Sequence, residues 1–232
     1  MPTSQLTELL GLSSRPVAIA FVAAAPAGVP PVSRREPAGC GYWRRAAAGE
    51  VFYTVADDHK SCPVGAHTHN VPLSPPEKQE LMGLVGTMVG LEYLKMEDVP
   101  QIPTRKSPLQ VAVYAPLEAA PVAPDVVLIR GNARQLMLLA EAAQSAGVAG
   151  SSPPMGRPTC SVVPEAINAQ STAASFGCIG NRVYTGAPDD EAYFAVPGDQ
   201  VRAVEERLAV IIRANTELEK FHRARAGSAP AA

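Results

Sequence analysis

The chain has 232 residues, 47% of them hydrophobic, which is enough for a core that needs no disulfide staples. Its 20 basic and 22 acidic residues give a net charge of −2, and only 5% of the residues are aromatic. This composition offers neither a basic field nor a base-stacking surface, so we exclude nucleic acid and anionic membranes as partners. We expect a small-molecule ligand, and the sequence leaves a homo-oligomer open.

The first predicted elements are a short capped helix within 3–12, with Leu6, Leu9 and Leu10 on one face, and a buried strand at 17–22. The apolar run of this strand is too short to span a bilayer, and it lacks the features of an export signal. Four cysteines in a chain without an export signal are expected to be reduced thiols. We therefore expect a cytoplasmic protein without disulfides.

The remaining pattern alternates helices and strands. Expected helices begin at Cys40, Ser74 and Asn132, and expected strands are 51–56, 109–117, 125–131 and 192–198. From about Asp199 a heptad-like apolar stripe predicts a long closing helix. Together these elements predict a single α+β domain over 1–226, with a mixed sheet, packed helices and a disordered tail at 227–232.

The helix expected after Ser74 carries three glycines in its interior, Gly83, Gly86 and Gly90. Each costs about 1 kcal/mol relative to alanine in a helix. Such glycines are typical of a face against which a neighbouring element packs closely, and we expect that packing here rather than a ligand contact.

The four cysteines lie at turn-rich junctions rather than inside apolar strands or helices. A structural cysteine usually hides in a core element, whereas ligating thiols sit in loops that can fold around a site. No C-x₂₋₄-C pair typical of zinc modules occurs, but dispersed cysteines can still converge. We predict an iron-sulfur cluster or a transition metal, with ligands Cys40, Cys62, Cys160 and Cys178.

The segment "DDHKSCPVGAHTHN" at 57–70 places His59 three residues before Cys62 and is expected to form a loop. His59 could serve as an auxiliary ligand or proton donor, or as the base of a reactive thiol, and Gly65 lets a cofactor approach. The alternative is an ordinary polar loop. His67 and His69 are expected at the rim of the site or in solvent.

A second constellation is "SFGCIGNRVYTG", in which Gly177 and Gly180 flank Cys178 and permit close approach of a bound group. Arg182 could bind the charge of an anionic substrate, and the segment "GRPTC" offers a similar pairing of Arg157 with Cys160. The alternative is a tight turn in which Arg182 pairs with a nearby carboxylate. We expect the loops carrying Cys62 and Cys178 to lie against each other.

These residues predict a cytoplasmic metal or iron-sulfur protein that acts on a small anionic molecule by redox or one-carbon chemistry. One alternative is a metal-free thiol enzyme using Cys62 with His59, or Cys178 with Arg182. Another is a binding or sensor module without chemistry. The residues therefore leave enzymatic activity undecided.

Four segments together resemble domain-of-unknown-function family 169 over nearly the whole chain. They are "CGYWRRAAAGEVFYTVADDHKSCPVGAHTH", "PDVVLIRGNARQLMLLAEAA", "GRPTCSVVP" and "GCIGNRVYTG" with the following "DDEAYFAVPG". The resemblance implies that the four cysteines, Gly65, Gly180 and Arg182 occupy motif positions of the family. It implies no reaction.

Overall fold

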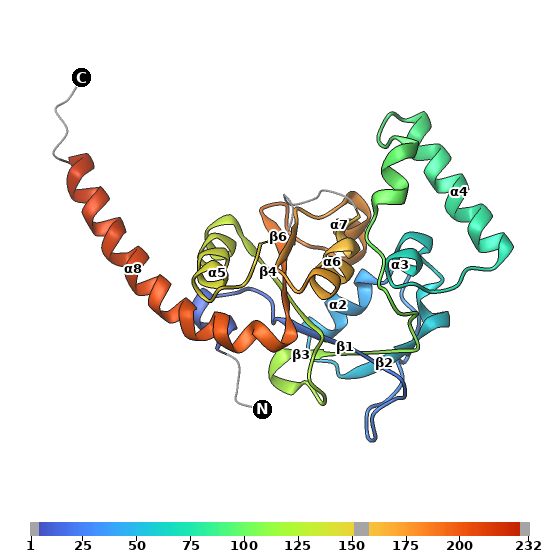
Figure 1. Cartoon of the computed structure of the whole chain (residues 1–232), viewed down its shortest axis with the longest axis horizontal. Coiled ribbons are helices and arrows are strands. Elements are labelled where there is room, and N and C mark those ends of the chain that lie inside the picture. Colours follow the sequence, from blue (N-terminus) through green and yellow to red (C-terminus); the bar gives the residue numbers. More distant parts are fainter. Residues whose placement is uncertain (1–4, 151–157, 228–232) are drawn as a thin grey trace.

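The computed structural model describes residues 5–150 and 158–227 and is built around one six-stranded sheet (Figure 1). The strand order is β2-β3-β1-β4-β6-β5, and every neighbouring pair is antiparallel. The sequence predicted a mixed sheet, whereas the paired strands are antiparallel. Among the described residues, parallel pairing occurs only in two isolated bridges, Pro31 with Tyr53 and Gly150 with Thr172. The strands are β1 (Val17–Val22), β2 (Phe52–Val55), β3 (Val111–Pro116), β4 (Val126–Asn132), β5 (Ala173–Ser175) and β6 (Glu191–Pro197).

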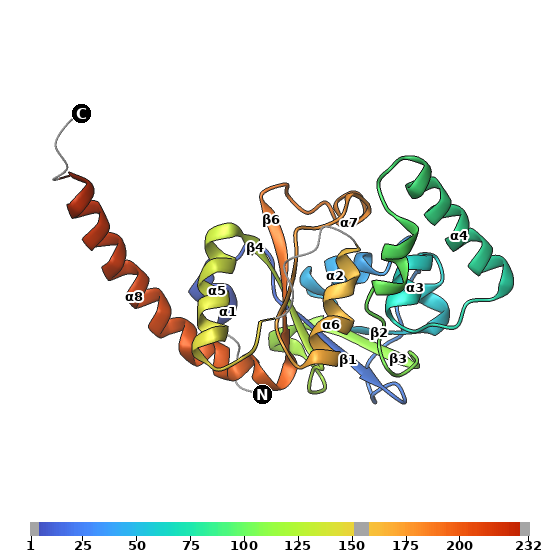
Figure 2. The same cartoon turned by 45° about the horizontal axis from the view of Figure 1, so that its top comes forward.

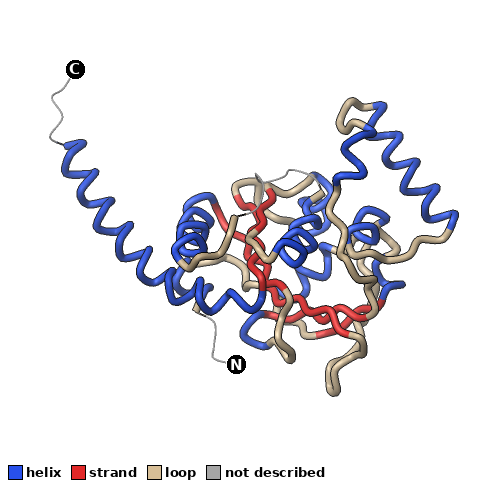
Figure 3. The backbone as a smooth tube through the Cα atoms, in the orientation of Figure 1, coloured by secondary structure: helices blue, strands red, loops and turns tan. Residues whose placement is uncertain are grey.

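Helices pack on both faces of the sheet, and on the second face they cover the part formed by β4 and β6 (Figures 2 and 3). The first layer holds α2 (Cys40–Ala47), α3 (Pro63–Thr68), α6 (Val162–Ala169) and α7 (Ile179–Thr185). The second holds α1 (Leu6–Leu10), α5 (Ala133–Ser145) and α8 (Val201–Gly227). Because both faces of the central strands are buried, these strands are apolar at nearly every position, and alternate side chains enter opposite cores.

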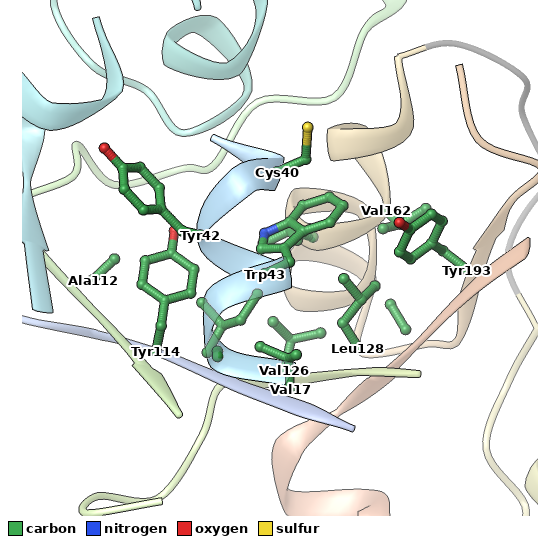
Figure 4. Packing of buried hydrophobic residues seen from close by; sticks show 14 of the residues in the cluster. Val17, Cys40, Tyr42, Trp43, Ala112, Tyr114, Val126, Leu128, Val162 and Tyr193 are labelled. Atoms are coloured by element: carbon green, nitrogen blue, oxygen red, sulfur yellow. The ribbon is translucent and has the colours of Figure 1, made fainter. Parts of the chain in front are cut away.

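The core under the first layer is aromatic. Trp43 is 2% exposed and meets the Tyr193 ring edge-on at 5.7 Å, and the Tyr42 ring lies 5.7 Å from that of Tyr114. Figure 4 shows Trp43 over Val17 and Leu128, and shows the Tyr114 hydroxyl at the end of the ring that points away from the sheet. This packing fixes α2 on the sheet and thereby sets the position of its first residue, Cys40.

In helix α4 (Pro75–Gly90) the glycines do not face the closely packed neighbour that the sequence predicted. The helix extends from the body as an arm, followed by the 3₁₀ helix η2 (Met96–Gln101), and its only buried residue is Val85. A Cβ added at Gly83, Gly86 or Gly90 would meet no described atom within 4 Å. The predicted close packing is therefore wrong for the described chain, because an apolar spacing marks a helix face without showing that the fold supplies a partner.

The α+β class and the long C-terminal helix are confirmed. The loop expected at 57–70 is instead mostly helical, with η1 (Ala56–His59) followed by α3, because Pro63 at the first helical position favours a new helix. The 3₁₀ helices η3 (Leu117–Ala119), η4 (Thr159–Ser161) and η5 (Gly198–Gln200) complete the fold. Helix α8 runs through Gly227, and the rest of the predicted tail lies outside the described residues. Within the described ranges, no helix combines the length and the apolarity needed to cross a bilayer.

Candidate functional site

Each of the four cysteines stands where a helix begins. Cys40 is the first residue of α2, and Cys62 and Cys178 are the N-caps of α3 and α7. Cys160 lies in η4, which leads directly into α6. All four are free cysteines. The sequence therefore places every thiol at a chain segment whose following backbone N–H groups have no partner within the helix.

The structure brings these four thiols together on one face of the sheet. Cys40 interacts electrostatically with Cys62 and Cys178, and those two interact with each other. Cys160 interacts with all three. Packing of α2 on α7, and of α3 on η4, places the four segments side by side although they are far apart in the sequence. The expected proximity of the loops carrying Cys62 and Cys178 is what the structure shows.

Hydrogen-bond donors surround the sulfur atoms. The backbone N–H of Gly65 donates to Cys62 Sγ at 3.4 Å, and that of Asn181 donates to Cys178 Sγ at 3.4 Å. Burial raises the pKa of the Cys40 and Cys160 thiols, and the Asn181 side chain and the Thr68 hydroxyl, respectively, offset part of that rise. Donors of this kind stabilise negative charge on sulfur, whether it belongs to a thiolate or to a cluster.

Asn181 is notable because its whole side chain is enclosed at the site. It is 2% exposed, and neither Nδ2 nor Oδ1 has a hydrogen-bond partner with good geometry. Its Oδ1 lies 3.6 Å from the position that a Cβ would take at Gly177, whose φ is +86°. Gly177 therefore both adopts a backbone conformation that favours glycine and leaves room for this amide.

Burial dominates the acidity of the thiols. It raises the pKa of Cys40 to about 12, and it also raises the pKa of Cys62 and of Cys160. At neutral pH these three thiols are protonated unless a cation replaces the proton. Figure 4 shows the Cys40 sulfur pointing away from the apolar side chains beneath it. Among the described residues, no three His, Cys, Asp or Glu side chains form a group that could hold a metal ion as they stand.

His59 lies near Gly39, the residue before Cys40, and one nitrogen of its ring has a hydrogen-bond partner. It is 1% exposed, and its Nε2 lies 2.8 Å from Thr54 Oγ1. Its Nδ1 is buried without a hydrogen-bond partner, 3.4 Å from where a Cβ at Gly39 would be. Burial lowers the pKa of His59 well below its ordinary value, so the ring is neutral at pH 7. A neutral imidazole supplies no positive charge to activate the thiol of Cys62.

The placement expected for His69 is wrong. It is 1% exposed and stacks on His59 with ring centroids 5.1 Å apart, while its Nδ1 lies 2.9 Å from the Gly65 carbonyl oxygen. His67 is partly buried, with Nε2 3.2 Å from Thr104 Oγ1. Position 69 is the C-cap of α3, so its side chain turns back over the core, which a loop interpretation of this segment did not foresee.

Arg182 holds the loop that precedes α7. Its guanidinium donates to the carbonyl oxygens of Phe176, Pro188 and Glu191, and it lies 3.8 Å from the fully exposed Asp189 carboxylate. These bonds fix the turn that presents Cys178. Its assignment to substrate binding remains a prediction.

The predicted cofactor-binding residues lie at different distances from the sulfur atoms. Gly65 lies next to the sulfur of Cys62, since a Cβ at Gly65 would be 3.4 Å from Cys62 Sγ. Gly180 faces only Tyr184, at 3.7 Å. Arg157 lies outside the described residues. The sequence did not predict Asn181 or Thr68 as site residues. The only signal was their spacing from a cysteine: Asn181 follows Cys178 by three residues, and Thr68 follows Cys62 by six.

The family comparison agrees with the motifs. The model of DUF169, an uncharacterised family described as ArCR, matches residues 5–207, a range that includes all four cysteines. The chain belongs to this family. Comparison with curated proteins and with solved structures finds no match. Membership in DUF169 thus supports the resemblance seen in the sequence and assigns no reaction.

Proposed function

We propose that this DUF169 protein binds an iron-sulfur cluster or a transition metal through Cys40, Cys62, Cys160 and Cys178. The observation that carries the proposal is the convergence of four free thiols from four separate segments, since Cys178 acts electrostatically on Cys40, Cys62 and Cys160, and Cys62 acts on Cys40 and Cys160. Four thiolates are the usual ligand set of iron-sulfur clusters and of structural zinc. A bound cation would replace the protons of these thiols and balance the negative charge of the resulting thiolates.

The donors around the sulfur atoms support a cluster in particular. The Gly65 and Asn181 amides already point at sulfur, and the enclosed Asn181 side chain has unused polar atoms beside Cys40. Iron-sulfur clusters depend on such N–H···S bonds, which set their reduction potential. On this proposal the protein works in the cytoplasm, where thiols stay reduced, and transfers electrons or assists one-carbon chemistry on a small anionic molecule.

A metal-free thiol enzyme has less support. An activated nucleophile needs a lowered thiol pKa, whereas burial raises the pKa of Cys62 and the adjacent His59 is neutral. The donors of Arg182 are directed to backbone carbonyls rather than to Cys178.

The test is metal and sulfide analysis of anaerobically purified wild type and two variants. Cys62→Ser should lose most of the bound metal, because a hydroxyl ionises poorly and is a hard ligand. Ser61→Ala, at the exposed neighbouring residue, is the matched control and should retain the metal. Iron with labile sulfide would identify a cluster, and zinc without sulfide would identify a single-metal site. Wild-type protein that holds neither would refute the proposal.

A further inference from the structure

A small cavity lies at the opposite end of α2 and α7 from the thiols. Its volume is about 20 Å³, room for about one water molecule. Three arginines and no acidic residue line it, together with Trp43, Thr185 and Tyr193; the arginines are Arg15, Arg44 and Arg130. The cavity is separate from the cysteine site, since Cys40 begins α2 and Ala47, at the other end of that helix, lines the cavity.

The wall of this cavity contains a buried donor without a partner. Trp43 is 2% exposed, and its indole Nε1 has no hydrogen-bond partner among the described residues. An indole N–H can only donate, and buried donors in native proteins nearly always bond to protein, water or ligand. The cavity that Trp43 lines is a place where an acceptor oxygen for this N–H can sit.

The positive charge of the arginine side chains favours an anion over a neutral group as that acceptor. Arg130 is committed, with Nε 2.7 Å from the Glu191 carboxylate. Arg15 and Arg44 are about half exposed, and their ion pairs, to Glu118 at 3.4 Å and to Glu36 at 3.6 Å, are with residues outside the lining. The Arg15–Glu118 pair is solvent-exposed and contributes little, so Arg15 can turn toward a ligand. Glu36 is buried, but Arg45 and Arg34 also lie 3.8 and 3.9 Å from its carboxylate, so Glu36 keeps basic neighbours when Arg44 turns toward a ligand. Guanidinium groups favour carboxylate and phosphate oxygens.

We propose that this cavity is a binding site for an oxyanion, the carboxylate or phosphate group of a small molecule. One ligand oxygen enters the cavity beside Trp43, and the rest of the group lies between Arg15 and Arg44. The site does not depend on whether the thiols hold a metal. It offers a positively charged anchor that differs from Arg157 and Arg182, the two arginines that the sequence suggested.

Trp43 also makes the site measurable, because it is the only tryptophan of the chain. The test is a fluorescence titration of the full chain with sodium phosphate and with sodium acetate, at constant ionic strength maintained with sodium chloride. Wild-type protein should show a saturable change with at least one of the two anions. A response to phosphate alone identifies phosphate esters as the ligand class, and a response to acetate alone identifies carboxylates.

Three single variants decide whether the signal comes from this cavity. Arg44→Gln and Arg15→Gln should each weaken the apparent affinity by about fivefold or more, the loss typical of one charge-assisted hydrogen bond. Arg34→Gln makes the same change of charge at a side chain that is 76% exposed and does not line the cavity, and should leave the affinity unchanged. Unaltered circular dichroism and emission maxima in the anion-free buffer would show that the variants fold.

Three results would overturn the proposal. The first is a wild-type response to chloride equal to that to phosphate and acetate, which would show general screening. The second is an Arg34→Gln effect as large as that of Arg44→Gln. The third is no saturable response to either anion. Metal analysis of the same samples tests the proposed cysteine site independently, so failure of one proposal can be distinguished from failure of the other.

Discussion

Replacing His69 should change how the stability of the protein depends on pH. Burial lowers the pKa of His69 from its ordinary value of 6.5 to about 4 in the folded chain. Between these two values the unfolded chain binds more protons than the folded chain. Stability is therefore fully present above pH 6.5 and falls as the pH drops toward 4.

The size of the effect follows from the two pKa values of His69. At about pH 5 the unfolded histidine is almost fully protonated and the folded one is almost neutral, which costs about 2 kcal/mol of unfolding free energy relative to neutral pH. The loss approaches about 3 kcal/mol below the folded pKa. His59, whose pKa burial also lowers, adds a loss of the same sign.

The assay is urea unfolding of wild type and His69→Phe at about pH 7.5 and pH 5, within the range where the two His69 states differ. Phenylalanine keeps the ring that packs on His59 and Phe21. Between the two pH values, the unfolding free energy of the variant should fall by about 2 kcal/mol less than that of wild type. His222→Phe, at an exposed position of α8, controls for the removal of a histidine. Equal pH dependence in wild type and His69→Phe would refute the argument from burial.

Four further predictions concern the glycines and the enclosed amide. Gly83→Ala in the open face of α4 should raise the unfolding free energy by about 1 kcal/mol in urea unfolding. Gly198→Ala should lower it by about 1–3 kcal/mol or more, because the new Cβ would overlap the Pro124 carbonyl. Gly65→Ala should reduce bound metal because the new Cβ, 3.4 Å from Cys62 Sγ, takes up space beside that sulfur, whereas Gly180→Ala should not, and metal analysis of the pair decides. Asn181→Leu should retain the metal but shift a cluster's reduction potential downward in an anaerobic dithionite titration, since it removes an amide beside Cys40; an unchanged potential would contradict that role.

The fold was largely predictable because its elements carry strong local signals. The alternation of core-facing residues in β1 and β4 and the Asn132 cap of α5 depend on nearby residues alone. The arm formed by α4 was not predictable, since its apolar spacing equals that of a buried helix and only the tertiary structure shows that most of it lacks a neighbour.

The cysteines of the candidate site could be picked out from the sequence, but the polar residues around them could not. Four cysteines at turns stand out in any sequence, and their convergence followed from treating them as parts of one site. Asn181, Thr68 and His69 are ordinary polar residues, and their importance comes from their burial beside the core, which the sequence alone does not show. The cavity beside Trp43 depends on residues from five separate segments, and no local motif announces it.

The most direct test of the account is the iron and acid-labile sulfide content of the wild-type protein, purified and analysed without oxygen. We predict stoichiometric iron and sulfide, with Cys40, Cys62, Cys160 and Cys178 protected from alkylation until the metal is removed. Protein that contains no metal and whose four thiols react equally before and after chelation would contradict the account.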